Sequence, residues 1–188
     1  MPILGTVASQ FSSKPFGSYE SIATSTVGVG GATDITFSDI NSNYAHLQVR
    51  IIARTTQSNS NVNLRFQVNG DTGSNYSFHQ MYAYGSSIGA EGGGNMSFGL
   101  TMQSPGSTSS GNMFGIGILD ILEYKNTNIY KTFRLLGGND QNTSTEGFSN
   151  FISTNWRSTS AITSLKFYYP AGNLAQYSQV ALYGIKES

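Results

Sequence analysis

Histidine and cysteine, the side chains that most often act as general base and as thiolate nucleophile, are scarce in this chain. It contains two histidines, His46 and His79, and no cysteine. A hydrolytic triad would need one histidine beside a serine and an orienting carboxylate. Residues 85–89, Gly-Ser-Ser-Ile-Gly, match the nucleophile motif Gly-x-Ser-x-Gly, but that motif requires a helix after the serine, and the glycines at 92–94 oppose one. We therefore interpret His79 as a hydrogen-bonded strand residue and expect the protein not to be an enzyme.

The acidic residues include one close pair. Asp120 and Glu123 are three positions apart, and in a strand this spacing places them on opposite faces, which disfavours two-carboxylate glycosidase chemistry. Asp120 lies inside the apolar run 113–122. The available partners are Arg50, Arg54 and Arg134. We predict a structural ion pair between Asp120 and Arg134, the alternative being a catalytic carboxylate.

Oxygen-bearing side chains are concentrated in residues 69–75, Asn-Gly-Asp-Thr-Gly-Ser-Asn, as they are in calcium-binding loops. The segment lacks the third carboxylate and the later bidentate glutamate of such a loop. We therefore expect a hairpin connection in which Asp71 caps the turn, and no metal site. Residues 28–31 lack the third spaced glycine of a dinucleotide fingerprint, and no phosphate loop follows. No cofactor is predicted.

Aromatic side chains alternate along residues 76–84. One face of this predicted strand carries Tyr76, Phe78, Tyr82 and Tyr84, and the other carries His79 and Met81. An aromatic row that faces inward fills a core, whereas one that faces solvent can bind the face of a sugar. We expect Phe78 in the core. Tyr82 and Tyr84 adjoin the glycine-rich stretch 85–94, which we predict to be a loop, and with His79 they are the candidate glycan-binding residues.

The elements that must position these residues are strands, because apolar and polar residues alternate with a period of two. Residues 44–55 and 61–68 show this pattern most clearly, and we predict that they are neighbours across a polar loop. Further strands are expected at about 18–27, 31–37, 76–84, 95–102, 112–122, 129–137, 147–155, 162–169 and 177–186. Turn-forming residues separate them, and helix signals are nearly absent. This pattern predicts an all-β, antiparallel β-sandwich of jelly-roll type.

Residues 1–17 lie outside this pattern. They mix apolar and small polar residues without a sustained period, and we interpret them as an extended N-terminal arm before a single β-sandwich domain at 18–188. The apolar residues of the arm are Ile3, Leu4, Val7, Phe11 and Phe16. They are the candidate partner-binding residues because such an arm gains by lying on a neighbouring subunit or partner; the alternative is a disordered terminus.

The absence of net charge limits the classes of molecule that this chain is expected to bind. The chain has 188 residues, a length that fits one domain, with 10 basic and 10 acidic residues and no net charge. Nucleic-acid binding requires a basic excess that neutralises phosphates, so neither nucleic acid nor an anionic membrane surface is an expected partner. No apolar run approaches the roughly 20 residues of a membrane span, and the first residues lack the features of a secretion signal.

Seven short segments of the sequence are distinctive when taken together in their order along the chain. They are residues 44–50 (YAHLQVR), 69–80 (NGDTGSNYSFHQ), 120–127 (DILEYKNT), 131–134 (KTFR), 156–162 (WRSTSAI), 175–178 (AQYS) and 182–185 (LYGI). Together they resemble a family of tailed-bacteriophage virion proteins that is common in phages of aquatic bacteria. The resemblance spans nearly the whole chain, and its specificity comes from the blocks in combination.

This resemblance implies a structural protein on the exterior of the virion, made in the host cytoplasm, with a β-sandwich fold and no catalytic residues. Family members occur as stand-alone chains and within longer tail proteins. A short chain with an arm and one sandwich is similar to capsid decoration, or cement, proteins, which typically trimerise and clamp neighbouring capsomers. The expected partners are then copies of the chain in a homotrimer and the major capsid protein. The alternative is a tail-fibre or baseplate adhesin, associated with tail proteins, that binds a host surface glycan.

Overall fold

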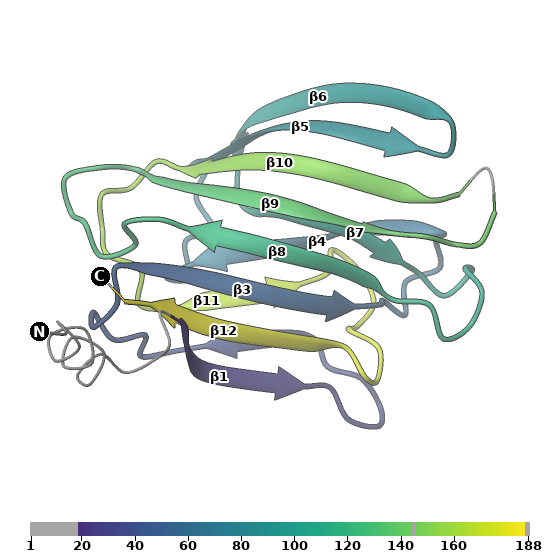
Figure 1. Ribbon diagram of the computed structural model, residues 1–188, viewed down its shortest axis with the longest axis horizontal. Coiled ribbons are helices and arrows are strands. Elements are labelled where there is room, and N and C mark those ends of the chain that lie inside the picture. The colour runs from purple at the N-terminus through teal and green to yellow at the C-terminus, as the bar shows by residue number, and fades with distance from the viewer. Residues whose placement is uncertain (1–18, 144–145, 187–188) are drawn as a thin grey trace, which may run out of the picture.

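Two antiparallel β-sheets make up the computed structural model, which describes residues 19–143 and 146–186 (Figure 1). The strands in this part of the chain are β1 (Tyr19–Thr26), β2 (Asp34–Phe37), β3 (His46–Ala53), β4 (Asn61–Val68), β5 (Tyr76–Tyr84), β6 (Ser87–Met96), β7 (Gly99–Pro105), β8 (Gly115–Ile121), β9 (Lys131–Asn139), β10 (Phe148–Trp156), β11 (Leu165–Tyr168) and β12 (Gln179–Ile185). The described residues form no helix, and hence none that could cross a membrane. The expectation of an all-β, antiparallel fold is confirmed.

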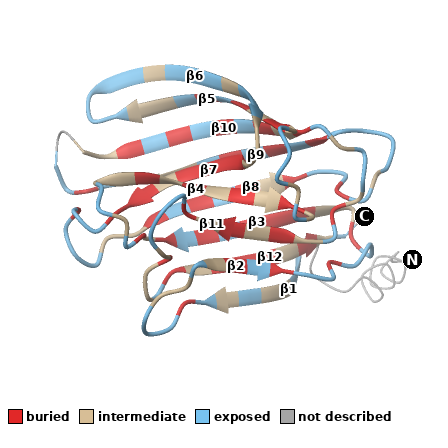
Figure 2. Cartoon of the chain, turned by 180° about the vertical axis from the view of Figure 1, so that it is seen from behind, coloured by how far each residue is buried: buried red, intermediate tan, exposed pale blue. Residues whose placement is uncertain are grey.

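The two sheets differ in width. The wide sheet has the strand order β1-β12-β3-β8-β9-β10-β5-β6, and the narrow sheet has the order β2-β11-β4-β7. The edge strand β7 of the narrow sheet packs across from β8, β9 and β10 of the wide sheet. In Figures 1 and 2 the narrow sheet ends at β7, while the wide sheet continues through β5 and β6. The arrangement is sandwich-like, with one sheet extending past the other.

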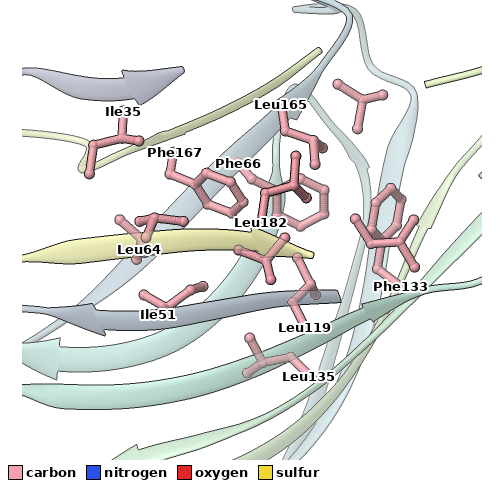
Figure 3. Packing of buried hydrophobic residues seen from close by; sticks show 14 of the residues in the cluster. Ile35, Ile51, Leu64, Phe66, Leu119, Phe133, Leu135, Leu165, Phe167 and Leu182 are labelled. Atoms are coloured by element: carbon pink, nitrogen blue, oxygen red, sulfur yellow. The ribbon is translucent and has the colours of Figure 1, made fainter. Parts of the chain in front are cut away.

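The core lies between the sheets and follows from the period-two alternation. Along β4, Val62, Leu64, Phe66 and Val68 are buried, with more exposed polar residues between them. Leu47, Val49, Ile51 and Ala53 of β3 are buried in the same way. Figure 3 shows Phe66 beside Phe133 of the wide sheet, and their ring centroids are 4.7 Å apart. This aromatic contact joins the two layers at the centre of the core.

The glycine-rich stretch 85–94, predicted as a loop, is mostly strand. Residues Ser87–Met96 form β6, which pairs with β5 and lies at the edge of the wide sheet. Three glycines of β6 lie opposite ring-bearing residues of β5: Gly89 faces Tyr82, Gly92 faces His79 and Gly93 faces Phe78. A Cβ atom on Gly89 would lie 2.5 Å from the Tyr82 ring. The rings thus occupy the space left by the glycines, a cross-strand contact that stabilises a glycine-rich edge strand.

Two connections differ from the sequence prediction. Residues 44–55 and 61–68 were expected to be neighbours, but β3 lies in the wide sheet and β4 in the narrow one. Residues 69–75 were expected to form a hairpin, but β4 and β5 also lie in opposite sheets. A period-two pattern identifies a strand with one buried face and does not say which of two facing sheets it joins. Residues 1–17, the predicted arm, lie outside the described residues.

The buried side chain of Lys131 links two loop segments at the start of β9. The Nζ atom of Lys131 donates hydrogen bonds to the carbonyl oxygens of Asn126, Ile129 (2.9 Å) and Thr159 (3.3 Å). Lys131 is fully buried, and this burial lowers the pKa of its ammonium group. Its three donors are therefore used to tie the turn before β9 to the segment that follows β10.

We predict that Lys131→Met lowers the free energy of unfolding by about 2–4 kcal/mol, because it leaves three carbonyl oxygens without their shared donor. Chemical denaturation followed by intrinsic fluorescence would measure the loss. The control is Lys125→Met, since Lys125 is exposed and donates one long hydrogen bond of 3.3 Å to Ser42. Its expected effect is within about 0.5 kcal/mol. Equal effects of the two changes would contradict the role assigned to Lys131.

Candidate functional site

A cleft of about 320 Å³ lies beneath the part of the wide sheet that extends past β7. It is lined by Ser60, Asn61, Gln80, Tyr82, Tyr84, Glu91, Gln103 and Phe148. These residues come from β5, β6 and β10 on the wide sheet and from β4, β7 and the residue before β4 on the other side. The cleft therefore exists because the inner face of the wide sheet has no second sheet over it at this end.

Aromatic rings form one wall of the cleft. The rings of Tyr82 and Phe148 are nearly parallel, with centroids 5.5 Å apart and 11° between their planes. The Tyr84 ring lies 6.2 Å from that of Phe148. Because Gly89 has no side chain, the Tyr82 ring can lie over β6, where a Cβ atom would collide with it. The packing of Phe148 and the glycine thus fix the position of the Tyr82 ring.

Amide and carboxyl groups form the rest of the wide-sheet wall. The Nε2 atom of Gln80 donates a short hydrogen bond to Oε1 of Glu91, and Oε1 of Gln80 accepts one from Nδ2 of Asn150 at 3.3 Å. Gln80 and Asn150 are buried, whereas Glu91 is exposed. Gln80 therefore connects the interior of the sheet to a carboxylate that solvent can reach, and it orients that carboxylate.

The opposite rim is also built from amides. Oδ1 of Asn61 accepts hydrogen bonds from Nδ2 of Asn139 and Nε2 of Gln141, both at 3.0 Å. Within the described part of the chain, Nδ2 of Asn61, Oε1 of Gln141 and Oδ1 of Asn150 are buried without a hydrogen-bond partner. Such groups are costly unless water or a ligand satisfies them. The surroundings of the cleft therefore have unused hydrogen-bonding capacity.

The outer face of the wide sheet, unlike the cleft, carries a line of exposed apolar side chains. Strand register aligns four apolar side chains across β8, β9, β10 and β5. They are Ile118, Leu136, Phe151 and Met81, with exposed fractions of 44%, 65%, 40% and 63%. We name this set the apolar row. Ile52 of β3 and Ile116 of β8 lie opposite each other beside the apolar row. They line part of a broad hollow of about 1130 Å³.

The structure separates the three candidate glycan-binding residues. Tyr82 and Tyr84 line the cleft, but His79 lies on the other face of β5, is exposed, and pairs with Gly92. His79 thus lies outside the cleft, on the face that its alternation with Tyr82 and Tyr84 indicated, and glycan binding by these residues stays a prediction. Ser87, the serine of the Gly-x-Ser-x-Gly match, begins the strand β6 and does not precede a helix.

Asp120 and Arg134 lie opposite each other on β8 and β9, on the outer face of the wide sheet. The distance from Nη2 of Arg134 to Oδ2 of Asp120 is 3.2 Å, and Nε2 of Gln48 donates to Oδ1 of Asp120 at 2.9 Å. Both carboxylate oxygens thus have partners. The arm residues Ile3, Leu4, Val7, Phe11 and Phe16 lie outside the described residues.

Sequence reasoning missed most of the polar residues of the cleft. Gln80 stands in phase with Tyr82 and Tyr84 on β5, and this spacing alone would have placed it on their face. Glu91, Asn61 and Gln103 come from three other strands. No sequence signal brings these residues together, because their proximity depends on strand pairing and on which sheet each strand joins.

Residues 69–75 form a connection that the Asp71 carboxylate stabilises through hydrogen bonds. Asp71 accepts hydrogen bonds from the backbone N of Gly73 (2.8 Å), from Nδ2 of Asn75 (2.9 Å) and from Nε1 of Trp156 (2.7 Å). Burial by itself would raise the pKa of Asp71, but these hydrogen bonds, that of Trp156 above all, hold it below the ordinary value of 3.8. In the described ranges no three His, Cys, Asp or Glu side chains gather as a metal site would need.

Comparisons of this chain with protein-family models, with curated proteins and with solved structures find no match. We therefore infer function from the cleft, the outer face and the sequence itself.

We predict that Asp71→Asn lowers the free energy of unfolding at pH 7 by about 1–3 kcal/mol, since an amide offers one acceptor oxygen and a misplaced donor. The carboxylate has a lowered pKa in the folded state, so its stabilisation is present above pH 3.8 and is lost as the pH falls through the folded-state value. The stability difference between wild type and variant should therefore shrink in acid.

Denaturant titrations between pH 2 and pH 7 would measure this. The control is Asp39→Asn, because Asp39 is exposed and its positive φ of 55° is one that asparagine tolerates. A difference that stays constant across this pH range would contradict the proposed role of the Asp71 carboxylate.

Proposed function

We propose that this chain is a non-enzymatic structural protein of a tailed-phage virion, and specifically a capsid decoration (cement) protein on the outer shell. The observation that carries the proposal is the apolar row on the outer face of the wide sheet. Large contiguous apolar patches on the surface of a soluble protein often mark a contact surface. The sequence segments that resemble virion proteins suggest the partner for this surface, the major capsid protein.

We also infer that the sandwich is a jelly roll. In support, β1, β2, β3 and β4 pair with β12, β11, β8 and β7 respectively, so the pairs are nested along the chain. A jelly roll is such a nested hairpin wrapped into two facing sheets. On this interpretation the hairpins β5–β6 and β9–β10 are insertions that widen one sheet. Viral capsid and lectin domains use this fold, which makes it compatible with either candidate function.

The outer face is suited to contact with a capsid. Its central row is apolar. Arg50 lies opposite Ile118 at one end of the row, with its guanidinium 5.1 Å from the centroid of the Tyr183 ring, and Asp120 and Arg134 neutralise each other. Complete burial of a Leu, Ile, Phe or Met side chain is worth about 1.5–3 kcal/mol. The partly exposed residues of the row thus offer several kcal/mol before the cost of association. A homotrimer would multiply this gain, because one bound subunit holds the others near their sites.

The arm at residues 1–17 supplies the second contact of this proposal. Its apolar residues would lie on a neighbouring subunit, and the apolar row would then remain available for the major capsid protein. Division of the contacts in this way lets each decoration subunit both trimerise and clamp capsomers.

The second candidate function is a tail-fibre or baseplate adhesin that binds a host glycan. One observation favours it: Tyr82 and Tyr84, the aromatic residues that such a site would use, line the same cleft as Gln80 and Glu91. The two functions differ in where the protein lies on the particle and in how many copies are present.

We predict that quantitative mass spectrometry of purified virions finds this chain in numbers close to those of the major capsid protein. A decoration protein covers the shell and must match the capsid lattice. A small fraction of that number would instead favour the adhesin, and complete absence from the particle would contradict both functions.

We predict that Leu136→Lys weakens binding to capsids that lack the protein by at least tenfold, a change of about 1.4 kcal/mol. The variant removes apolar contact and places a charge at the centre of the row, while the exposed position of Leu136 leaves folding intact. Co-sedimentation with purified capsids measures the effect, and size-exclusion chromatography checks that the oligomer persists.

The matched control is Thr132→Lys, which lies on the same face of β9 but away from the apolar row. It should bind capsids as the wild type does. Unchanged capsid binding by Leu136→Lys would show that this face is not the contact surface.

A further inference from the structure

We propose that the cleft beneath β5 and β6 binds a neutral saccharide, with Tyr82 as the aromatic platform and the Gln80–Glu91 pair as the group that recognises hydroxyls. The inference goes beyond capsid decoration. It supplies the ligand class of the second candidate function, and in that respect it rests on that function.

The aromatic wall provides the apolar half of a sugar site. A pyranose ring presents a face of C–H groups, and such faces pack against exposed aromatic rings. Tyr82 is half-buried, and its ring is held in place by the stacked Phe148 ring and by its close approach to Gly89. A ring that is already fixed loses little conformational freedom when a ligand binds. Tyr84, at the outer end of the same wall, extends the surface toward solvent.

The Gln80–Glu91 pair provides the polar half. A carboxylate accepts hydrogen bonds at two oxygens, and adjacent sugar hydroxyls offer two donors at a matching spacing. One oxygen of Glu91 already accepts a hydrogen bond from Nε2 of Gln80, and Oε1 of Gln80 in turn accepts one from Nδ2 of Asn150. The carboxylate is thus oriented by buried residues while it remains accessible. Charge-assisted hydrogen bonds of this kind are about twice as strong as neutral ones.

The far rim completes the site. Asn61 and Gln103 face the cleft from the narrow sheet, and amide groups can both donate to and accept from hydroxyls. Nδ2 of Asn61 is without a hydrogen-bond partner among the described residues. Because this atom is itself buried, ordered water would have to satisfy it, and such polar surroundings disfavour an apolar ligand.

The charge and the volume of the cleft limit the classes of ligand that it can bind. Of the described residues that line the cleft, Glu91 is the charged one, so the cleft disfavours phosphate, sulfate and uronic acids. The volume of about 320 Å³ lies at the lower end of the range for small-molecule sites and fits one or two sugar units. Because β6 is an edge strand, a longer chain can continue past the cleft into solvent.

The test is binding of the purified full chain to an array of neutral and acidic bacterial surface oligosaccharides, followed by calorimetric titration with the best neutral binder. We expect binding to neutral glycans, a loss of at least tenfold in affinity for Tyr82→Ala, and a loss of at least fivefold for Glu91→Gln. Glu91 is exposed, so the second variant separates recognition from folding.

The matched control is His79→Ala, which lies on the same strand but on the opposite face. It should bind as the wild type does. Absence of binding to every neutral glycan, or a loss of affinity for His79→Ala that exceeds that for Tyr82→Ala, would overturn the inference. Because the copy number on virions tests capsid decoration independently, failure of glycan binding would remove the adhesin function and leave decoration standing.

Discussion

The burial of one sheet against the other stops at β7, while the wide sheet continues through β5 and β6. Tyr76 at the start of β5 still contacts Phe66 of the narrow sheet, but the inner face farther along β5 has no second sheet over it, and the residue types change accordingly. Along β5, Tyr76 and Phe78 lie in the core, and then Gln80 and Tyr82 face the cleft. Polar groups left in a partly buried place must find hydrogen bonds. The difference in width between the sheets thus produces the cleft and the amide network around it.

The same difference makes β6 an edge strand with one neighbour. Glycines on an edge would usually weaken pairing, but here the Tyr82, His79 and Phe78 side chains of β5 lie over them. The Tyr82 ring therefore has two roles, since it stabilises β6 and forms the wall of the proposed sugar site. A feature that holds the edge strand in place also shapes the cleft, so fold and candidate site cannot be separated at this position.

Most of the strands could be predicted from the sequence, because alternation of apolar and polar residues is a local property. The strand β6 could not, since its glycines have low strand propensity and its stability comes from rings on the neighbouring strand. The pairing of β3 with β8 instead of β4 was also out of reach, because a short loop can either return within one sheet or cross to the other. For the cleft, Tyr82 and Tyr84 were identified from spacing along one strand. Glu91, Asn61 and Gln103 required the sheet order.

The nested pairing has a consequence for how the protein is made. The strand β1 pairs with β12, and β2 pairs with β11, so each of these segments has a partner that is translated much later. At about 5–20 residues per second, on the order of ten seconds or more separates the synthesis of β1 from that of β12. The pair β5–β6 can form as soon as it leaves the ribosome, whereas the outer pairs must wait. Closure of both sheets is therefore a late event that follows the synthesis of residues 179–185.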